Sequence, residues 1–239
     1  MNTEIKIGVV RFPGSNCDLD TVYVLRDVLG VSADLVWHKD KLEGFGGIVL
    51  PGGFAYGDAL RAGIIAAYSP VIQEVKTLAR EGVPVAGICN GFQVLIEAGL
   101  LPGALLPNDG LKFICKWVNL RVEHSDTAFT NVEKKGGLWK LPIAHGEGRY
   151  FADKTILKEL HENNQIVFLY VNDEGEPTED ANPNGSLESI AGICNLERNV
   201  LGLMPHPERG SEKTLSPYRT DHGKRFFQSM IEYIRKGVA

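Results

Sequence analysis

The sequence predicts an α/β protein whose sheet is mostly parallel and flanked by helices. Short apolar runs rich in β-branched residues are separated by helical stretches, which is the pattern of a parallel sheet. The runs are apolar throughout, so both faces of each strand are expected to be covered. At 239 residues, with no linker composition and no internal repeat, the chain fits one large domain over residues 1–239.

The first half of the chain carries most of the expected parallel strands. Strands are predicted at residues 5–10, 33–37, 47–50 and 83–88. Helices are predicted at residues 18–29, 69–81 and 90–99. Ligands of such sheets bind beyond the carboxyl ends of the strands. The loops after Val10, Leu50 and Ile88 are therefore the first places to look for a site.

The second half of the chain has a different texture. Residues 101–107 are broken by prolines, and residues 172–185 form a polar, turn-rich loop. Further strands are predicted at residues 113–123, 189–195 and 200–204, and an amphipathic helix at residues 220–236. The strand at 200–204 leads directly into a Pro-His-Pro-Glu sequence. A histidine is therefore expected at the end of a buried strand.

Composition argues against several classes of function. The chain is 44% hydrophobic and 23% charged with a formal net charge of −5, so it has no electrostatic footprint for nucleic acid or an anionic membrane. No apolar run approaches the ~18 residues of a membrane span, and the first residues do not resemble a signal peptide. The cysteines, at positions 17, 89, 115 and 194, lie far apart, so neither a disulfide framework nor a metal site is expected. We expect a cytoplasmic protein with reduced thiols.

The segment from Gly87 to Gly91 places Cys89 between two glycines. G-x-C-x-G is the cysteine form of the nucleophile elbow, a tight strand-to-helix turn that holds the nucleophile in a strained, exposed position. A Cβ at either glycine would collide with a neighbouring strand or helix. The helix N-terminus places N–H groups beside the sulfur, which favours the thiolate. The pattern alone leaves open a buried structural cysteine, the commonest role of a free cysteine.

Two adjacent glycines, Gly52 and Gly53, follow the strand at 47–50. Glycines at a strand end allow backbone N–H groups to turn toward a bound oxygen, as an oxyanion hole requires. A plain Pro-Gly-Gly turn explains the same residues. Both interpretations stay open, whereas a phosphate-binding loop is not favoured because the chain lacks the P-loop motif.

A nucleophilic cysteine needs a base, and the base needs an orienting partner. Of the six histidines, His206 stands out because it follows a buried strand and has a proline on each side, which restricts where the ring points. Glu208, two positions on, would project the same way on extended backbone and accept from the ring N–H. An exposed charge pair is the alternative for this motif alone. The elbow cysteine and the Gly-Gly loop together favour the catalytic interpretation.

Residues 142–150 close another segment whose glycines suggest that backbone comes close to a ligand. The segment contains His145 and Gly146. A simple charged turn is an equally good explanation of its composition. From the residues alone, both interpretations stay open.

Together these motifs resemble the class I, triad-type glutamine amidotransferases. The resemblance rests on GICNGFQ at residues 87–93 and PHPE at residues 205–208. Segments at residues 12–18, 52–63 and 143–150 resemble the branch of the family that serves purine biosynthesis as a separate subunit. The chain departs from that branch at Ala55, where serine is usual, and at Ala59, where a larger residue is usual. Neither belongs to the triad, so we interpret both as local packing changes.

The resemblance implies a flavodoxin-like fold, the class I amidotransferase architecture, and a mechanism. Cys89 would attack the side-chain amide of glutamine, with His206 as the base and Glu208 orienting its ring. The backbone N–H groups of Gly53 and Asn90 would hold the oxyanion. The substrate-binding residues implied in the same way are Gly52, Gln93, His145 and Gly146.

The resemblance also implies partners. The chain has no nucleotide-binding motif, so the ammonia would be used elsewhere. The implied partners are a large ATP-dependent synthetase subunit, which converts formylglycinamide ribonucleotide to its amidine, and a small bridging subunit. ATP and Mg²⁺ would bind the synthetase, and no cofactor is expected on this chain. The loops at residues 11–18 and 149–150 are expected to form the contact surface.

Two other functions stay open at this point. One is a free-standing cysteine hydrolase on the same fold, either a γ-glutamyl hydrolase or an intracellular peptidase. The other is a non-catalytic regulator that kept the fold, against which the complete triad argues. The sequence assigns no role to Cys17, Cys115 or Cys194.

Overall fold

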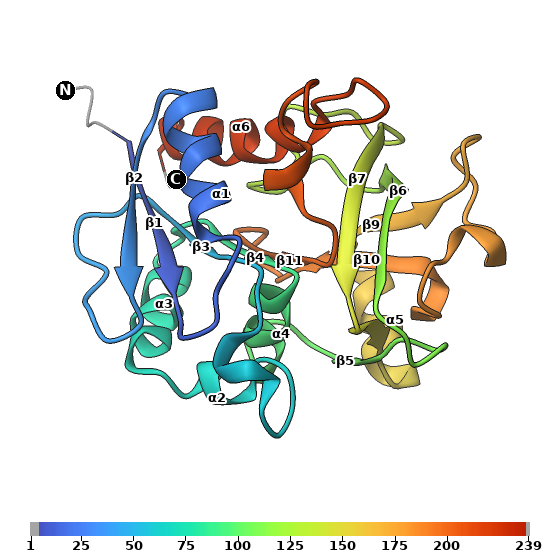
Figure 1. Ribbon diagram of the computed structural model, residues 1–239, viewed down its shortest axis with the longest axis horizontal. Coiled ribbons are helices and arrows are strands. Elements are labelled where there is room, and N and C mark those ends of the chain that lie inside the picture. Colours follow the sequence, from blue (N-terminus) through green and yellow to red (C-terminus); the bar gives the residue numbers. More distant parts are fainter. Residues whose placement is uncertain (1–4, 238–239) are drawn as a thin grey trace.

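The computed structural model describes residues 5–237 and is built around one twisted sheet (Figure 1). The nine strands follow the order β2-β1-β3-β4-β11-β10-β9-β6-β7. Figure 1 shows α1 and α6 on one face of the sheet and α3 and α4 on the other. Residues 1–4 and 238–239 lie outside the described part, so the expected single domain over residues 1–239 stays a prediction, as does the interpretation of the N-terminal start.

The parallel half of the sheet carries the site. Its strands are β2 (Ser32–Trp37), β1 (Lys6–Arg11), β3 (Gly47–Leu50), β4 (Val85–Ile88) and β11 (Val200–Leu203). Its helices are α1 (Asp18–Tyr23) with the π-helical turn η1 (Val24–Val28), α2 (Ile64–Ala67), α3 (Pro70–Arg80), α4 (Asn90–Glu97) and α6 (His222–Arg235). The predicted strands and helices of this half are confirmed, with ends that move by a few residues. The α/β class and the parallel sheet flanked by helices are confirmed as well.

The other half of the sheet is antiparallel. Its strands are β10 (Ile190–Cys194), β9 (Ile166–Val171), β6 (Ile114–Val122) and β7 (Leu138–His145). A two-stranded sheet of β5 (Ala104–Pro107) and β8 (Glu147–Phe151) and helix α5 (Lys154–Glu162) complete it. The short helical turns are η2 (Ala55–Asp58), η3 (Glu179–Ala181), η4 (Leu187–Ser189) and η5 (Pro207–Gly210). Strand β5 forms despite its proline because Pro107 is its last residue, where the pairing with β8 is irregular.

The strand ends meet at one edge of the sheet and define the site. Ile88, the last residue of β4, pairs with Leu203 of β11, and Gly87 pairs with Leu50 of β3. Because these strands are parallel, the loops that follow them emerge side by side. The backbone N–H of Cys89 donates to the Leu203 carbonyl at 2.8 Å. The elbow cysteine therefore starts beside the two strand ends that lead to the Gly-Gly loop and to the Pro-His-Pro-Glu sequence.

Helix α4 is more deeply buried than an amphipathic helix would be. Phe92, Leu95 and Ile96 are buried as expected, but the polar side chains of Asn90 and Gln93 are buried too. The cause is cover from the parallel sheet on one side and from α2 and β5 on the other. Buried amides must find hydrogen-bond partners within the protein.

In the described part of the chain, no helix is both long and apolar enough to cross a membrane.

We expect Gly202→Ala to destabilise the fold. A Cβ at Gly202, in the middle of β11, would overlap the buried ring of Phe92 on α4. Overpacking of this kind lowers the free energy of unfolding by about 1–3 kcal/mol. Chemical denaturation followed by circular dichroism measures the effect. Gly110→Ala is the matched control, since its Cβ would meet nothing within 4 Å, and an equal loss in both variants would contradict the packing account.

Candidate active site

Cys89 has the strained backbone of a nucleophile elbow. Its φ of 50° and ψ of −105° lie outside the regions that L-residues prefer. The two flanking glycines are required, as expected. A Cβ at Gly91 would overlap the Leu50 carbonyl, and one at Gly87 would lie 2.5 Å from Leu95 Cδ1. Neighbouring backbone thus holds the cysteine in a conformation that it would not adopt alone.

The Cys89 sulfur lies at the start of α4. The N–H groups of Phe92 and Gln93 donate to the Cys89 carbonyl at 3.0 and 3.2 Å. The N–H of Asn90 is one of the two predicted oxyanion donors. It lies in the first turn of α4, where backbone N–H groups have no acceptor within the helix. The sulfur lies 3.8 Å from the Ala144 carbonyl, and only 5% of the residue is exposed. The expected exposed position of the nucleophile was therefore wrong, because Ala144 and neighbouring residues cover Cys89 and leave little access to its thiol.

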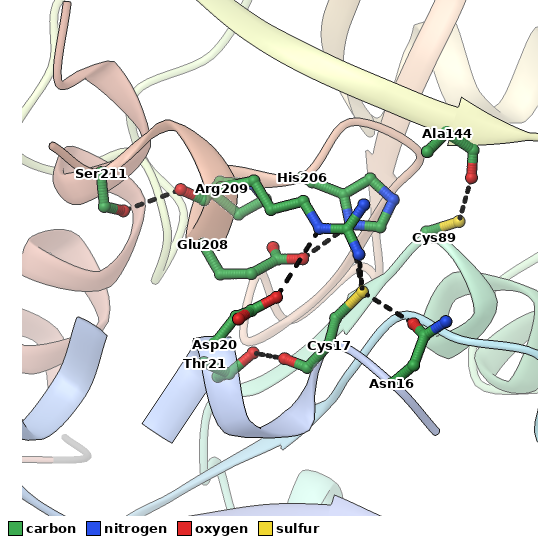
Figure 2. Close-up of polar contacts among 11 residues, drawn as sticks. Asn16, Cys17, Asp20, Thr21, Cys89, Ala144, His206, Glu208, Arg209 and Ser211 are labelled. Atoms are coloured by element: carbon green, nitrogen blue, oxygen red, sulfur yellow. Dashed lines mark hydrogen bonds and ion pairs between the residues drawn. The ribbon is translucent and has the colours of Figure 1, made fainter. Parts of the chain in front are cut away.

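His206 and Glu208 form a buried pair next to this sulfur (Figure 2). His206 Nδ1 donates to Glu208 Oε1 at 2.6 Å, and the two residues are 2% and 1% exposed. Burial opposes the charged imidazole, but the Glu208 carboxylate and then the Cys89 sulfur outweigh it, so the pKa of His206 is raised well above its ordinary value. His206 Nε2 has no hydrogen-bond partner within residues 5–237. That nitrogen is available to exchange a proton.

The prediction that Glu208 lies on extended backbone was wrong. His206 itself is extended, with a φ of −102° and a ψ of 92°, but Glu208 lies in the 3-10 turn η5 rather than on extended backbone. The turn starts at Pro207, whose fixed φ suits the first position of a helical turn. The two side chains meet because the chain bends between them.

Gly52 and Gly53 sit where the loop after β3 meets the histidine and the loop after β1. A Cβ at Gly52 would lie 2.7 Å from His206 Cε1. A Cβ at Gly53 would lie 2.8 Å from the backbone of residues 14–16, with which Gly53 forms an isolated bridge at Ser15. The pair is therefore more than a plain turn, because both glycines make room for site residues. The roles of Gly52 in binding glutamine and of Gly53 as an oxyanion donor stay predictions.

Both polar atoms of the Gln93 side chain bind protein groups. Its Oε1 accepts from Asn90 Nδ2 at 2.8 Å, and its Nε2 donates to the Glu147 carbonyl at 2.7 Å. Asn90 Nδ2 also points to Asp58 Oδ1 at 3.3 Å. Burial, with Glu147 nearby, raises the pKa of Asp58 to about 6. The contact between Gln93 and glutamine stays a prediction, and the structure gives Gln93 a role in linking α4 to the β7–β8 corner.

His145 and Gly146 form that corner and are organised by Asn108, a residue that sequence reasoning missed. Asn108 Oδ1 accepts from His145 Nδ1 at 2.9 Å, and Asn108 donates to the carbonyls of His145 and Gly146 at 2.8 and 2.9 Å. Burial, assisted by nearby His206, lowers the pKa of His145 to about 4, so its ring is neutral at physiological pH. Each carbonyl keeps a second lone pair, and the predicted contact with glutamine stays a prediction.

Cys17 and Arg209 also belong to the site, although sequence reasoning gave neither a role. The Cys17 sulfur lies 3.8 Å from His206 Nδ1 and accepts from Arg209 Nη2 at 3.0 Å, as Figure 2 shows. Burial raises the pKa of the Cys17 thiol. The signal that would have found Cys17 is its position after the first strand, in one of the three loops singled out for inspection.

A metal does not suit this cluster. Within residues 5–237, Cys17, His206 and Glu208 form the one group of potential ligands, with their ligand atoms within 4.8 Å of one another. The Arg209 guanidinium beside the sulfur would repel a cation, and the ring nitrogen nearest to Cys17 already donates to Glu208. A buried thiol with a raised pKa is also a poor ligand, because metals bind the thiolate.

Comparison with known proteins agrees with this architecture. A family model described as a CobB/CobQ-like glutamine amidotransferase domain matches residues 4–234. The chain is similar to the phosphoribosylformylglycinamidine synthase subunit PurQ of Methanosarcina acetivorans, with 56% identity over 96% of this chain and 98% of the relative. It is 54% identical to the protein of that name from Koribacter versatilis, over 97% and 100% of the two chains. A chain in the structure of PurLQS from Thermotoga maritima superposes with a TM-score of 0.84 and 45% identity, over 96% of this chain and 99% of that chain.

We expect the imidazole of His206 to titrate above the ordinary histidine range. Replacing Glu208 by glutamine removes the nearest negative charge, so Glu208→Gln is expected to lower that pKa by at least about one unit. NMR of protein labelled at histidine measures both values. The internal control is His38, which contacts Tyr56 rather than Glu208, and an unchanged His206 pKa in the variant would contradict the assignment.

Proposed function

Since the chain belongs to the CobB/CobQ-like glutamine amidotransferase family, we propose that it is the glutamine-hydrolysing subunit of a phosphoribosylformylglycinamidine synthase. Relatives that carry that name share 50–56% of their residues with it over nearly the full length of both chains. The observation that carries the chemistry is the strained Cys89 beside a buried His206–Glu208 pair. The product would be ammonia for purine biosynthesis.

Glutamine hydrolysis would proceed in two covalent steps on Cys89. Because the raised pKa of His206 favours the imidazolium, the proton of the Cys89 thiol resides on His206 before the attack, and the Cys89 thiolate attacks the carbonyl carbon of the side-chain amide. The carbon–nitrogen bond then breaks, and His206 returns the proton to the leaving nitrogen, which departs as ammonia. A water molecule, deprotonated by His206, attacks the thioester and releases glutamate and the thiol. Glu208 stays ionised throughout and holds the ring in orientation.

Backbone amides would stabilise the charge that develops on the carbonyl oxygen. The proposed donors are the N–H groups of Asn90, at the start of α4, and of Gly53, in the loop after β3. Both loops follow neighbouring parallel strands, so the two donors lie on the same edge of the sheet as the nucleophile. Preorganised donors of this kind supply about 3–4 kcal/mol each of transition-state stabilisation.

The proposed subunit needs partners to be useful. We infer that a separate ATP-dependent synthetase subunit consumes the ammonia and that a small bridging subunit completes the complex. ATP and Mg²⁺ would bind the synthetase. The expected contact surface at residues 11–18 and 149–150 was wrong for Phe12, Cys17, Asp18 and Tyr150, which are buried. We propose that the exposed residues of these segments, such as Gly14 and Asn16, form part of the contact surface. A cytoplasmic location fits this role and the four unbridged cysteines.

Cys89→Ala is expected to abolish glutamine-dependent synthesis of formylglycinamidine ribonucleotide but to spare synthesis from added ammonium. The reason is that ammonia formation and amidine formation occur on different subunits. Assays of the assembled complex with each nitrogen source measure the two activities. Loss of both would mean that Cys89 is structural. A purified wild-type chain with high glutaminase turnover and no stimulation by a synthetase would instead favour a free-standing hydrolase.

The two members of the buried pair should differ in their effect. His206→Ala removes the proton carrier, so glutamine hydrolysis should fall by about 10⁴-fold or more, whereas Glu208→Gln keeps the imidazole and should cost less. Steady-state glutaminase assays of the assembled complex measure the ranking, with circular dichroism of each variant as the control for folding. Equal losses in the two variants would contradict the roles given to them.

A further inference from the structure

We propose that the side chain of Asn90 is a positioning residue that holds the loop after β3 in register with the nucleophile elbow. This inference rests on the proposed function and concerns the side chain of Asn90, which is distinct from its backbone N–H. The side chain has no assigned part in the two chemical steps. It is nevertheless 2% exposed and lies directly beside Cys89 in the chain.

Every polar atom of this amide binds a different part of the site. Asn90 Oδ1 accepts from the backbone N–H of Ala55 at 3.1 Å, and Nδ2 donates to Gln93 Oε1 at 2.8 Å and to Asp58 Oδ1 at 3.3 Å. Ala55 and Asp58 belong to the loop after β3, and Gln93 lies one helical turn along α4. One buried side chain thus joins the loop that contains Gly53 to the helix that contains the elbow.

The loop after β3 needs such a contact because its backbone is strained. Tyr56 and Asp58 both have a positive φ, of 55° and 53°. Conformations of this kind persist only where the surroundings over-determine them. The tip of the loop is held by the Tyr56 hydroxyl, which lies 3.2 Å from His38 Nδ1. The end nearest Gly53 is held by Asn90 through Ala55.

The same amide extends to the third segment of the site. Gln93 accepts from Asn90 with its oxygen and donates to the Glu147 carbonyl with its nitrogen. Glu147 follows the His145–Gly146 corner, which is proposed to hold glutamine. A continuous line of hydrogen bonds therefore runs from Ala55 through Asn90 and Gln93 to Glu147. Such buried networks are effective only when each member is satisfied.

Asn90→Asp tests the proposal because it changes hydrogen-bond chemistry with little change in shape. The variant keeps the acceptor for Ala55 N–H but replaces the Nδ2 donor by a carboxylate oxygen that faces Gln93 Oε1 and the Asp58 carboxylate. We expect glutaminase kcat in the assembled complex to fall by about 10–100-fold, less than the roughly 10²–10³-fold that complete loss of an oxyanion donor costs. Ammonium-dependent synthesis should stay within about two-fold of the wild type.

A reciprocal variant distinguishes positioning from simple damage. Asn90→Asp with Asp58→Asn restores one donor and one acceptor between the two positions, in reverse, and should recover kcat by at least about five-fold. Asn199→Asp is the matched control, since Asn199 is also buried and donates to backbone carbonyls, those of Ala79 and Val83, at the amino end of β4. We expect this control to keep glutaminase kcat within about two-fold of the wild type, because Asn199 lies at the opposite end of β4 from Cys89.

Asn90→Ser covers the case in which the aspartate variant does not fold, because it removes the long contacts without adding charge. It should show the same selective loss of kcat. Wild-type kcat in both Asn90 variants, or a loss of kcat no larger than that of Asn199→Asp in both, would overturn the proposal. Failure of the proposed function is a separate outcome, since the wild-type complex itself would then make no amidine from glutamine.

Discussion

The backbone conformation of Cys89 is the constraint on which the rest of the site depends. A non-glycine residue with a φ of 50° and a ψ of −105° is costly, so its neighbours must hold it there. They do so through close packing: Gly91 against the Leu50 carbonyl, Gly87 against Leu95, and Gly202 against the ring of Phe92. The strain is therefore distributed over β3, β4, β11 and α4, the same elements whose ends carry the other site residues.

Cys17 and Cys89 both lie near His206, but their surroundings differ. Cys17 lies 3.8 Å from His206 Nδ1, on the nitrogen that donates to Glu208, and it has a raised pKa and an arginine neighbour. Both cysteines precede a helix, Cys17 as the N-cap of α1 and Cys89 as the N-cap of α4, but the backbone of Cys17, with a φ of −100° and a ψ of 8°, has no positive φ. Of these two cysteines, only Cys89 has the strained backbone, and it lies beside the backbone N–H groups that are proposed to stabilise the negative charge of the oxyanion. This difference supports the proposal that Cys89, rather than Cys17, is the nucleophile.

The sequence patterns predicted those features of the structure that depend on residues close to one another in the chain. Apolar runs and glycine spacing identified the parallel strands, the elbow at Cys89 and the His206–Glu208 pair. In the antiparallel half they predicted β6 and β10 but missed β7, β9 and the antiparallel pairing, because pairing such as that of β6 with β7 depends on partners distant in sequence. Cys17 and Asn108 were missed for the same reason: they meet His206 and His145 across 189 and 37 positions of the chain. Buried polar contacts between residues so distant in the chain produce no periodic pattern in the sequence.

The central claim is that the reactive sulfur is the one at the elbow. Its most direct test is labelling with a glutamine analogue that carries an electrophile in place of the side-chain amide, followed by peptide mapping of the modified residue. We expect modification at Cys89 alone, retained in a Cys17→Ser protein and lost in a Cys89→Ala protein. Modification at Cys17, or undiminished labelling after loss of the Cys89 thiol, would contradict it.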